Sequence, residues 1–63
     1  MEILDQQNNQ VLLSLDFDEV AALNNALNES LEHLEEWEFE TRMGVSQSQV
    51  QLLLKKFGEI RLV

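Results

Sequence analysis

The stretch VLLSLDFDEVAALNNAL, residues 11–27, is the most informative part of the chain for its architecture, because the spacing of its apolar residues changes halfway along. In the first half Val11, Leu13 and Leu15 fall on one face of an extended chain, and this period of two predicts a half-buried β-strand. From Val20 onward the apolar residues recur every three or four positions, as on one face of an amphipathic helix. The apolar positions of this helix are Val20, Leu23, Leu27, Leu31 and Leu34. The stretch therefore predicts a strand that leads directly into a helix.

Local signals mark the start of this helix. Asp16 is suited to the N-cap position, and Glu19, three residues later, completes an acidic form of the capping box. Leu15 and Val20 occupy the two positions of a hydrophobic staple. Acidic residues in the first turn also suit the positive end of the helix dipole. We therefore expect the helix to begin just after Asp16.

A second short strand is expected upstream, joined to the first by the residues QNNQ. Asn tolerates positive φ, so Asn8–Asn9 can form a tight two-residue hairpin turn. In that register Leu4 lies opposite Leu13 and Gln6 lies opposite Val11. The pairing of Leu with Leu favours this register, and the hairpin would leave a free strand edge that invites pairing with a second copy of the chain.

Two shorter helices follow. The first covers EWEFETRM, residues 36–43, and Gly44 suits the left-handed position that ends a helix. The second begins after Ser46, an N-cap with Gln49 as its capping-box partner. Its apolar face consists of Val50, Leu53, Leu54, Phe57 and Ile60. Gly58 can end this helix early, and residues 59–63 are compatible with either helix or strand.

The predicted fold class is α+β, with one domain over residues 1–63: an N-terminal β-hairpin followed by three helices, the last two forming a helical hairpin. A chain of this length has a thin stability margin, and without Cys it has no disulfide to strengthen it. The predicted core consists of Leu4, Val11, Leu13, Leu15, Val20, Leu23, Leu27, Leu31, Leu34, Phe39, Val50, Leu53, Leu54 and Phe57. No apolar run approaches the roughly 18 residues of a membrane helix, and the N-terminus does not resemble a signal peptide, so we expect a cytoplasmic protein without a membrane partner.

Charge is distributed very unevenly along the chain. The net charge is -8, but residues 1–41 contain eleven acidic residues and no Lys or Arg, whereas residues 42–63 contain four basic residues and one acid. The acidic residues are densest between Glu29 and Glu40, around Trp37. Such a surface favours a basic partner.

Catalytic and metal chemistry find little support in the sequence. Glu29, His33 and Glu36 have helical spacing, but a paired-helix metal site needs Glu-x-x-His repeated on a second helix, and the chain has one His. No glycine-rich phosphate loop is present, and no Ser/His/Asp set has plausible spacing. We therefore expect no enzyme, no catalytic residue, no metal and no cofactor.

Two features of the long helix leave alternatives open. Its three central asparagines are Asn24, Asn25 and Asn28. They are either exposed or bonded to the hairpin backbone, or else they form a polar recognition patch. A second stripe of the same helix consists of Ala22, Ala26, His33 and Trp37. It either packs against the third helix or forms an interface in which Trp is the anchor.

Residues 37–57 resemble the bacterial helix-turn-helix family. The matching positions are Phe39, Met43, Gly44, Val45, Ser46, Val50 and Leu53. The resemblance implies that the second helix of this pair lies in the major groove of DNA. It further implies base contacts from Ser46, Gln47, Ser48 and Gln51 and phosphate contacts from Arg42, Lys55 and Lys56. The chain departs from the family pattern at Glu40, where a small residue is usual, and at Leu52, where a polar residue is usual.

The sequence favours a small, acidic, non-enzymatic protein-binding module of a bacterial type. One concrete form is an immunity protein or antitoxin that neutralises a basic, nucleic-acid-acting partner. The residues expected to bind this partner are Glu29, Glu32, His33, Glu36 and Trp37. The alternative is a helix-turn-helix DNA-binding regulator that acts as a dimer, and a homodimer is possible in either case.

Overall fold

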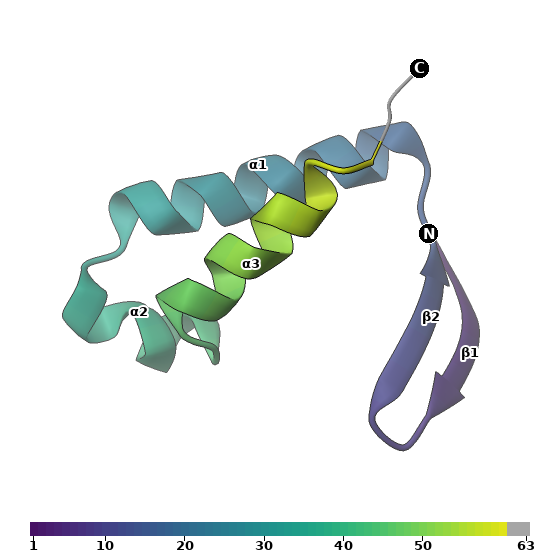
Figure 1. Cartoon of the computed structure of the whole chain (residues 1–63), viewed down its shortest axis with the longest axis horizontal. Helices are drawn as coiled ribbons and strands as arrows, with labels where there is room; N and C mark the ends of the chain where they lie inside the picture. The colour runs from purple at the N-terminus through teal and green to yellow at the C-terminus, as the bar shows by residue number, and fades with distance from the viewer. Residues whose placement is uncertain (61–63) are drawn as a thin grey trace.

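A computed structural model describes residues 1–60 and confirms the predicted α+β class (Figure 1). An antiparallel hairpin is followed by three helices. The elements are β1 (Glu2–Gln7), β2 (Gln10–Ser14), α1 (Phe17–His33), α2 (Glu36–Met43) and α3 (Gln47–Phe57). Gly58 caps α3, and the chain continues to Ile60 in a turn, while the rest of the ambiguous segment 59–63 lies outside the described residues.

The hairpin register agrees with the prediction near the turn and departs from it farther away. Gln6 pairs with Val11 as expected, and the turn contains two residues. The predicted pairing of Leu4 with Leu13 is wrong, because β1 carries a bulge and Ile3 is the residue opposite Leu13. A bulge inserts one extra residue into one strand and shifts the pairing beyond it. The bulge therefore exchanges Leu4 for Ile3 beside Leu13.

The turn does not have the positive φ values that were expected for its two asparagines. Its two residues are Asn8 and Asn9, but neither has positive φ; within residues 1–60 only a glycine, Gly44, does. Type I′ turns need positive φ at both central residues. The predicted turn length is therefore correct and the predicted turn conformation is wrong.

Both capping predictions for α1 and α3 are confirmed. Asp16 Oδ1 accepts a hydrogen bond from the Glu19 amide at 2.8 Å, and Glu19 Oε1 accepts one from the Asp16 amide at 3.0 Å. Ser46 Oγ accepts from the Gln49 amide at 3.2 Å, and Gln49 Oε1 accepts from the Ser46 amide at 2.9 Å. Each reciprocal pair satisfies two backbone amides that a helix start would otherwise leave unbonded.

Helix α2 occupies the predicted residues and ends as predicted. Gly44 has φ 78°, in the left-handed region, and its amide donates to the Glu40 carbonyl at 2.8 Å. Only glycine adopts this conformation without a steric penalty from Cβ. Gly44 thereby allows the chain to turn sharply from α2 into the cap of α3.

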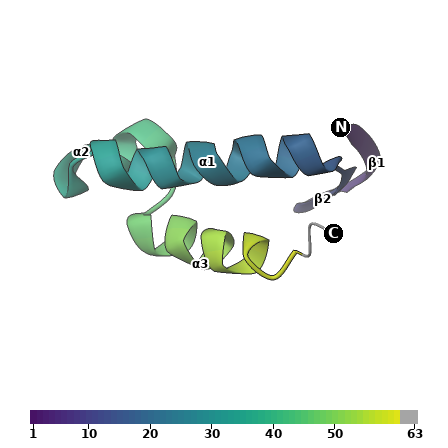
Figure 2. The same ribbon diagram turned by 90° about the horizontal axis from the view of Figure 1, so that it is seen from above.

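The core is small and lies among the three helices. Helices α1 and α3 run side by side, with α2 closing one end of the pair (Figures 1 and 2). The buried side chains within residues 1–60 are Val20, Phe39 and Val50, one from each helix. Half-buried apolar side chains surround them: Leu15, Leu27, Leu31, Leu34, Met43, Leu54 and Phe57. Phe39 is the largest buried side chain and joins α2 to this core.

The hairpin stands apart from the helices, which corrects the predicted core. Leu4, Val11 and Leu13 are between 44% and 59% exposed, because β1 and β2 pack on each other and not on the helices. Figure 1 shows the hairpin at the end of the molecule opposite α2. Helix α1 packs on α3 instead. Leu23 and Leu53, also predicted to be buried, are more than 40% exposed.

Candidate protein-binding surface

The acidic residues concentrate at one end of the molecule. We define this acidic end as residues 29–40. It comprises the last turns of α1, the connection to α2 and the first part of α2. Within it Glu29, Glu32 and His33 are all exposed and bring one oxygen or nitrogen atom each to within 4.8 Å of one another. His33 Nε2 lies 2.7 Å from Glu29 Oε2. The structure thus brings together three of the five residues predicted to bind a partner.

Much of the negative charge at the acidic end is not neutralised. Glu38 Oε1 pairs with Arg42 Nε at 3.2 Å, one turn farther along α2. By contrast, Glu32, Glu35, Glu36 and Glu40 form no ion pair with any residue between positions 1 and 60. Unpaired carboxylates on an exposed surface create a negative potential that attracts cationic groups. The acidic end therefore keeps its charge available to a partner.

Trp37 projects from the middle of the acidic end. Its side chain is 81% exposed, the highest exposure of any large apolar residue that the structure describes. It borders a shallow hollow on α2 together with Glu38, Thr41 and Arg42. Ala22, Ala26 and His33 are exposed as well, but they lie on α1 whereas Trp37 lies on α2, so the prediction that the four form one stripe of the long helix is wrong. Of the two alternatives for this stripe, packing against the third helix is also wrong, because all of its members are exposed.

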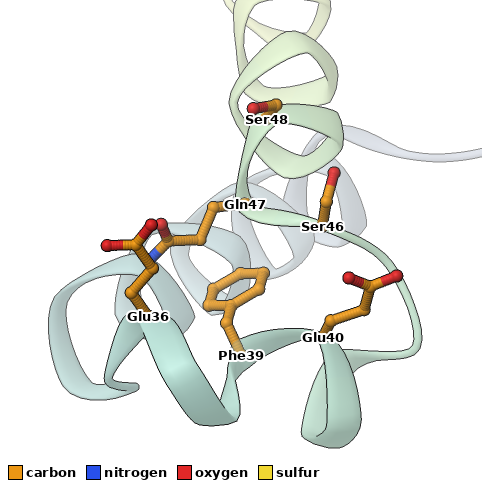
Figure 3. A pocket seen from close by; sticks show the side chains of 6 residues that line it. All are labelled: Glu36, Phe39, Glu40, Ser46, Gln47 and Ser48. Atoms are coloured by element: carbon orange, nitrogen blue, oxygen red, sulfur yellow. The ribbon is translucent and has the colours of Figure 1, made fainter.

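A second hollow lies between α2 and the start of α3 (Figure 3). It has a volume of about 220 Å³ and is lined by Glu36, Phe39, Glu40, Ser46, Gln47 and Ser48. In Figure 3 the side chains of Glu36 and Gln47 extend toward each other beside the Phe39 ring. Glu36 thus lies in this hollow and not in the Glu29–His33 cluster. The shared position of Glu36 and Glu40 in this hollow was not predicted, although their four-residue spacing indicates one helix face.

These two carboxylates flank the residues that the family resemblance assigns to DNA bases. Gln47 and Ser48 line the same hollow as Glu36 and Glu40. The Ser46 hydroxyl is occupied by the Gln49 amide, as described above. A surface that carries two carboxylates beside its base-reading residues repels the phosphates of a duplex. The structure therefore places the predicted base contacts in an acidic setting.

The predicted phosphate contacts are only partly available. Arg42 is paired with Glu38, and Lys56 Nζ lies 3.4 Å from Glu59 Oε2. Lys55 and Gln51 are exposed on α3, and Lys55 forms no ion pair within residues 1–60. Two of the three cations that would meet phosphate thus already have a carboxylate partner in the chain.

The three asparagines of α1 form no side-chain hydrogen bond to the hairpin within residues 1–60. Asn25 and Asn28 are exposed and Asn24 is half-buried. Within residues 1–60 no side-chain hydrogen bond holds any of the three. They therefore present their amides to solvent along α1.

Comparison with protein-family models, with curated proteins and with solved structures found no match to this chain. Among the helices of residues 1–60, none combines the length and the apolar character needed to cross a membrane. The assignment of function therefore depends on the geometry of the chain itself.

Proposed function

We propose that this chain is a small, non-enzymatic protein-binding module that binds a basic partner through its acidic end. The observation that carries the proposal is Trp37, an aromatic side chain that is 81% exposed at an acidic end where Glu32, Glu35, Glu36 and Glu40 have no ion-pair partner within residues 1–60. Large aromatic residues dominate the binding energy of protein interfaces when a partner covers them. The surrounding carboxylates supply charge complementarity, which speeds association and selects the partner.

The chemistry of the site defines the kind of partner. A Lys- or Arg-rich surface would meet the carboxylates of Glu32 and Glu36, and a guanidinium or an apolar pocket would cover the indole of Trp37. Basic surfaces of this kind are typical of proteins that act on nucleic acids. A concrete form of the proposal is therefore an immunity- or antitoxin-type neutraliser, whose carboxylates occupy sites that phosphates would otherwise take.

The alternative function is a helix-turn-helix DNA-binding regulator. The left-handed Gly44 and the cap at Ser46 support it, because they produce the tight connection between two helices that such proteins use. The same features serve any helical hairpin, however, and Glu36 and Glu40 lie beside the base-reading residues. Electrostatics therefore favours the protein-binding function.

A binding measurement with a defined basic probe tests the proposal. An Arg- and Lys-rich peptide carrying a fluorescent label is titrated with the protein at low salt. Charge reversal at the acidic end, Glu32→Lys with Glu36→Lys, is expected to weaken binding at least tenfold, as is Trp37→Ala. The matched control is Glu2→Lys with Asp18→Lys, which changes the net charge equally at the other end of the molecule. Equal weakening by both double variants would show that only net charge matters and would contradict a specific acidic site.

A second titration separates the two functions. A labelled mixed-sequence DNA duplex is titrated with the protein at low salt and again as salt rises. The protein-binding function predicts no saturable binding. Saturable binding that weakens steeply with salt, and that Lys55→Glu with Lys56→Glu abolishes, would establish phosphate contacts and favour the alternative.

A further inference from the structure

The isolated chain exposes more surface than a folded protein of its mass should. Its accessible surface is 5441 Å², whereas the usual scaling for a 7.3 kDa monomer gives about 4,200 Å². Its radius of gyration is 13.0 Å, against about 10.6 Å for a compact domain of this length. The surplus of about 1,200 Å² is the area that one subunit contributes to a stable homodimer interface. A large part of the chain's surface is therefore not packed against the rest of the chain, and a partner could cover it.

The hairpin contributes to this surplus, because every residue of both strands is exposed. Ile3, Val11 and Leu13 share one face, because Ile3 pairs with Leu13 and Val11 lies two residues from Leu13. A two-stranded hairpin without a third strand or a packed helix is at best marginally stable in water. A further strand paired with the hairpin would therefore stabilise it.

The two edges of the hairpin differ in their capacity to accept that strand. Strand β1 carries Glu2 and Asp5 and is bent by its bulge at Leu4, and both charge and bulges protect a strand edge from pairing. The Asp5 carboxylate also accepts the amide of Gln6 at 2.9 Å, so that this backbone donor is already occupied. Strand β2, with the sequence QVLLS, has no charge and no bulge. The open edge is therefore β2.

The backbone directions fix the register that β2 can offer. The Gln6 amide donates to the Asp5 side chain of its own strand and therefore does not bond to β2. Gln6 and Val11 are thus a pair without mutual hydrogen bonds, and their N–H and C=O groups point away from the partner strand of the hairpin. Successive residues alternate, so Val11 and Leu13 both direct their N–H and C=O groups to the free edge of β2. In an antiparallel pairing of two β2 strands, Val11 of each copy can then exchange both hydrogen bonds with Leu13 of the other. This places the two copies of Leu12 opposite each other on the symmetry axis.

We infer that the chain forms a symmetric homodimer in which two β2 strands pair antiparallel about Leu12, producing one four-stranded sheet. The interface is self-complementary, as a two-fold axis requires. Ile3, Val11 and Leu13 of both copies join into one apolar face of six side chains. The hairpin lies at the end of the molecule away from α2 (Figure 1), so the acidic ends of the two copies point away from each other. The inference is independent of the proposed function, because the acidic end stays free in the dimer.

The mass of the protein in solution, and the change in that mass when Leu12 is replaced, test this inference. Sedimentation equilibrium over a range of protein concentrations is expected to give twice the chain mass. Leu12→Lys sets two like charges directly opposite each other and is expected to raise the dimer dissociation constant at least tenfold. Leu4→Lys is the control: Leu4 is 59% exposed and Leu12 55%, but Leu4 lies on the protected strand. A monomer at all concentrations, or a dimer that Leu12→Lys leaves unchanged, would overturn the inference.

A crosslinking measurement tests the register separately. Residues opposite each other without mutual hydrogen bonds have Cα atoms about 4.5 Å apart, within the range that a disulfide spans. The chain has no Cys, so Leu12→Cys introduces a single thiol. Mild oxidation is expected to convert Leu12→Cys into a covalent dimer far faster than Leu4→Cys at the same concentration. Equal rates for the two variants would contradict the β2 register. Helical circular dichroism verifies that every variant keeps its helices.

Discussion

Asp16 and Glu19 bond to each other in both directions: each side chain accepts the backbone amide of the other, at 2.8 and 3.0 Å. This pair sets the point at which the extended chain of the hairpin becomes α1. It also lies at the only covalent link between the hairpin and the helices. Two carboxylates and two backbone amides therefore stabilise the point at which the chain changes from strand to helix.

Removal of this cap should destabilise the helical part of the chain. Asp16→Ala is expected to lower the free energy of unfolding by about 1 kcal/mol, because the Glu19 amide loses its acceptor. Asp16→Asn keeps an acceptor oxygen and should change stability by only a few tenths of that amount. Urea unfolding followed by helical circular dichroism measures both. Equal losses for Ala and Asn would show that the charge of Asp16, and not its hydrogen bond, stabilises α1.

Glu19 also makes stability depend on pH. The N-terminal ammonium of Met1, which lies against its carboxylate, and next the Asp16 backbone amide hold the pKa of Glu19 below its usual value of 4.5. A lowered folded-state pKa means that the ionised group stabilises the folded chain above the unfolded-state pKa. This contribution is lost as pH falls through the folded-state pKa. An NMR titration of the Glu19 carboxyl should therefore show a midpoint below 4.5, and Glu19→Gln should reduce the loss of stability on acidification.

Gly44 offers a test of backbone strain alone. Its φ of 78° is unfavourable for residues with a Cβ, but no atom lies within 4 Å of the position that a Cβ would occupy. Gly44→Ala should thus cost about 1–2 kcal/mol from conformation without any steric clash. Gly44→Asn should cost less, because Asn adopts the left-handed region more readily. Melting temperatures of the two variants provide the comparison, and a cost as large for Asn as for Ala would refute this explanation.

Two neighbouring residues of α3 should respond very differently to truncation. Val50 is 1% exposed and packs in the core, while Leu52 is 65% exposed. Val50→Ala is expected to lower the free energy of unfolding by about 2 kcal/mol, through lost burial and the cavity that it leaves. Leu52→Ala should stay within about 0.5 kcal/mol of the parent chain. Chemical unfolding of both variants checks the assignment of the core face.

The hairpin and the helices should also unfold separately. They share few contacts, so opening of the hairpin does not require opening of α1 and α3. In dilute protein, amide hydrogen exchange should be markedly faster in β1 and β2 than at the centres of α1 and α3. Exchange at one common rate throughout would mean that the hairpin is packed on the helices after all.

Local chemistry made the element boundaries predictable from the sequence. Asp16 with Glu19, Ser46 with Gln49, and Gly44 each act within one turn of helix, so their effect can be deduced without knowledge of the tertiary fold. The bulge at Leu4 could not be deduced in this way, because either Ile3 or Leu4 can lie beside Leu13 with an apolar contact. Register in a hairpin that nothing covers is only weakly specified.

The predicted core failed at the hairpin for a related reason. Alternation in β2 shows that Val11 and Leu13 share an apolar face, but it does not show what covers that face. The predicted core placed this face against the helices of the same chain, whereas the structure leaves the face open. At the acidic end, composition predicted the cluster around Glu29 and His33. Glu36 lies in a separate hollow because of the path that the chain takes between α1 and α2, and no local signal in the sequence specifies that path.

The separation of the hairpin from the helices also has a consequence for the timing of folding. Most pairings in the chain join residues close in sequence, the two strands across a two-residue turn and α2 to α3 through a short connection, whereas the packing of α1 on α3 joins residues farther apart. Such local pairings form within microseconds to milliseconds, since little chain entropy opposes their closure. A newly made chain therefore reaches its final shape almost at once. Its slowest event would be the encounter of two copies, whose rate rises with their concentration.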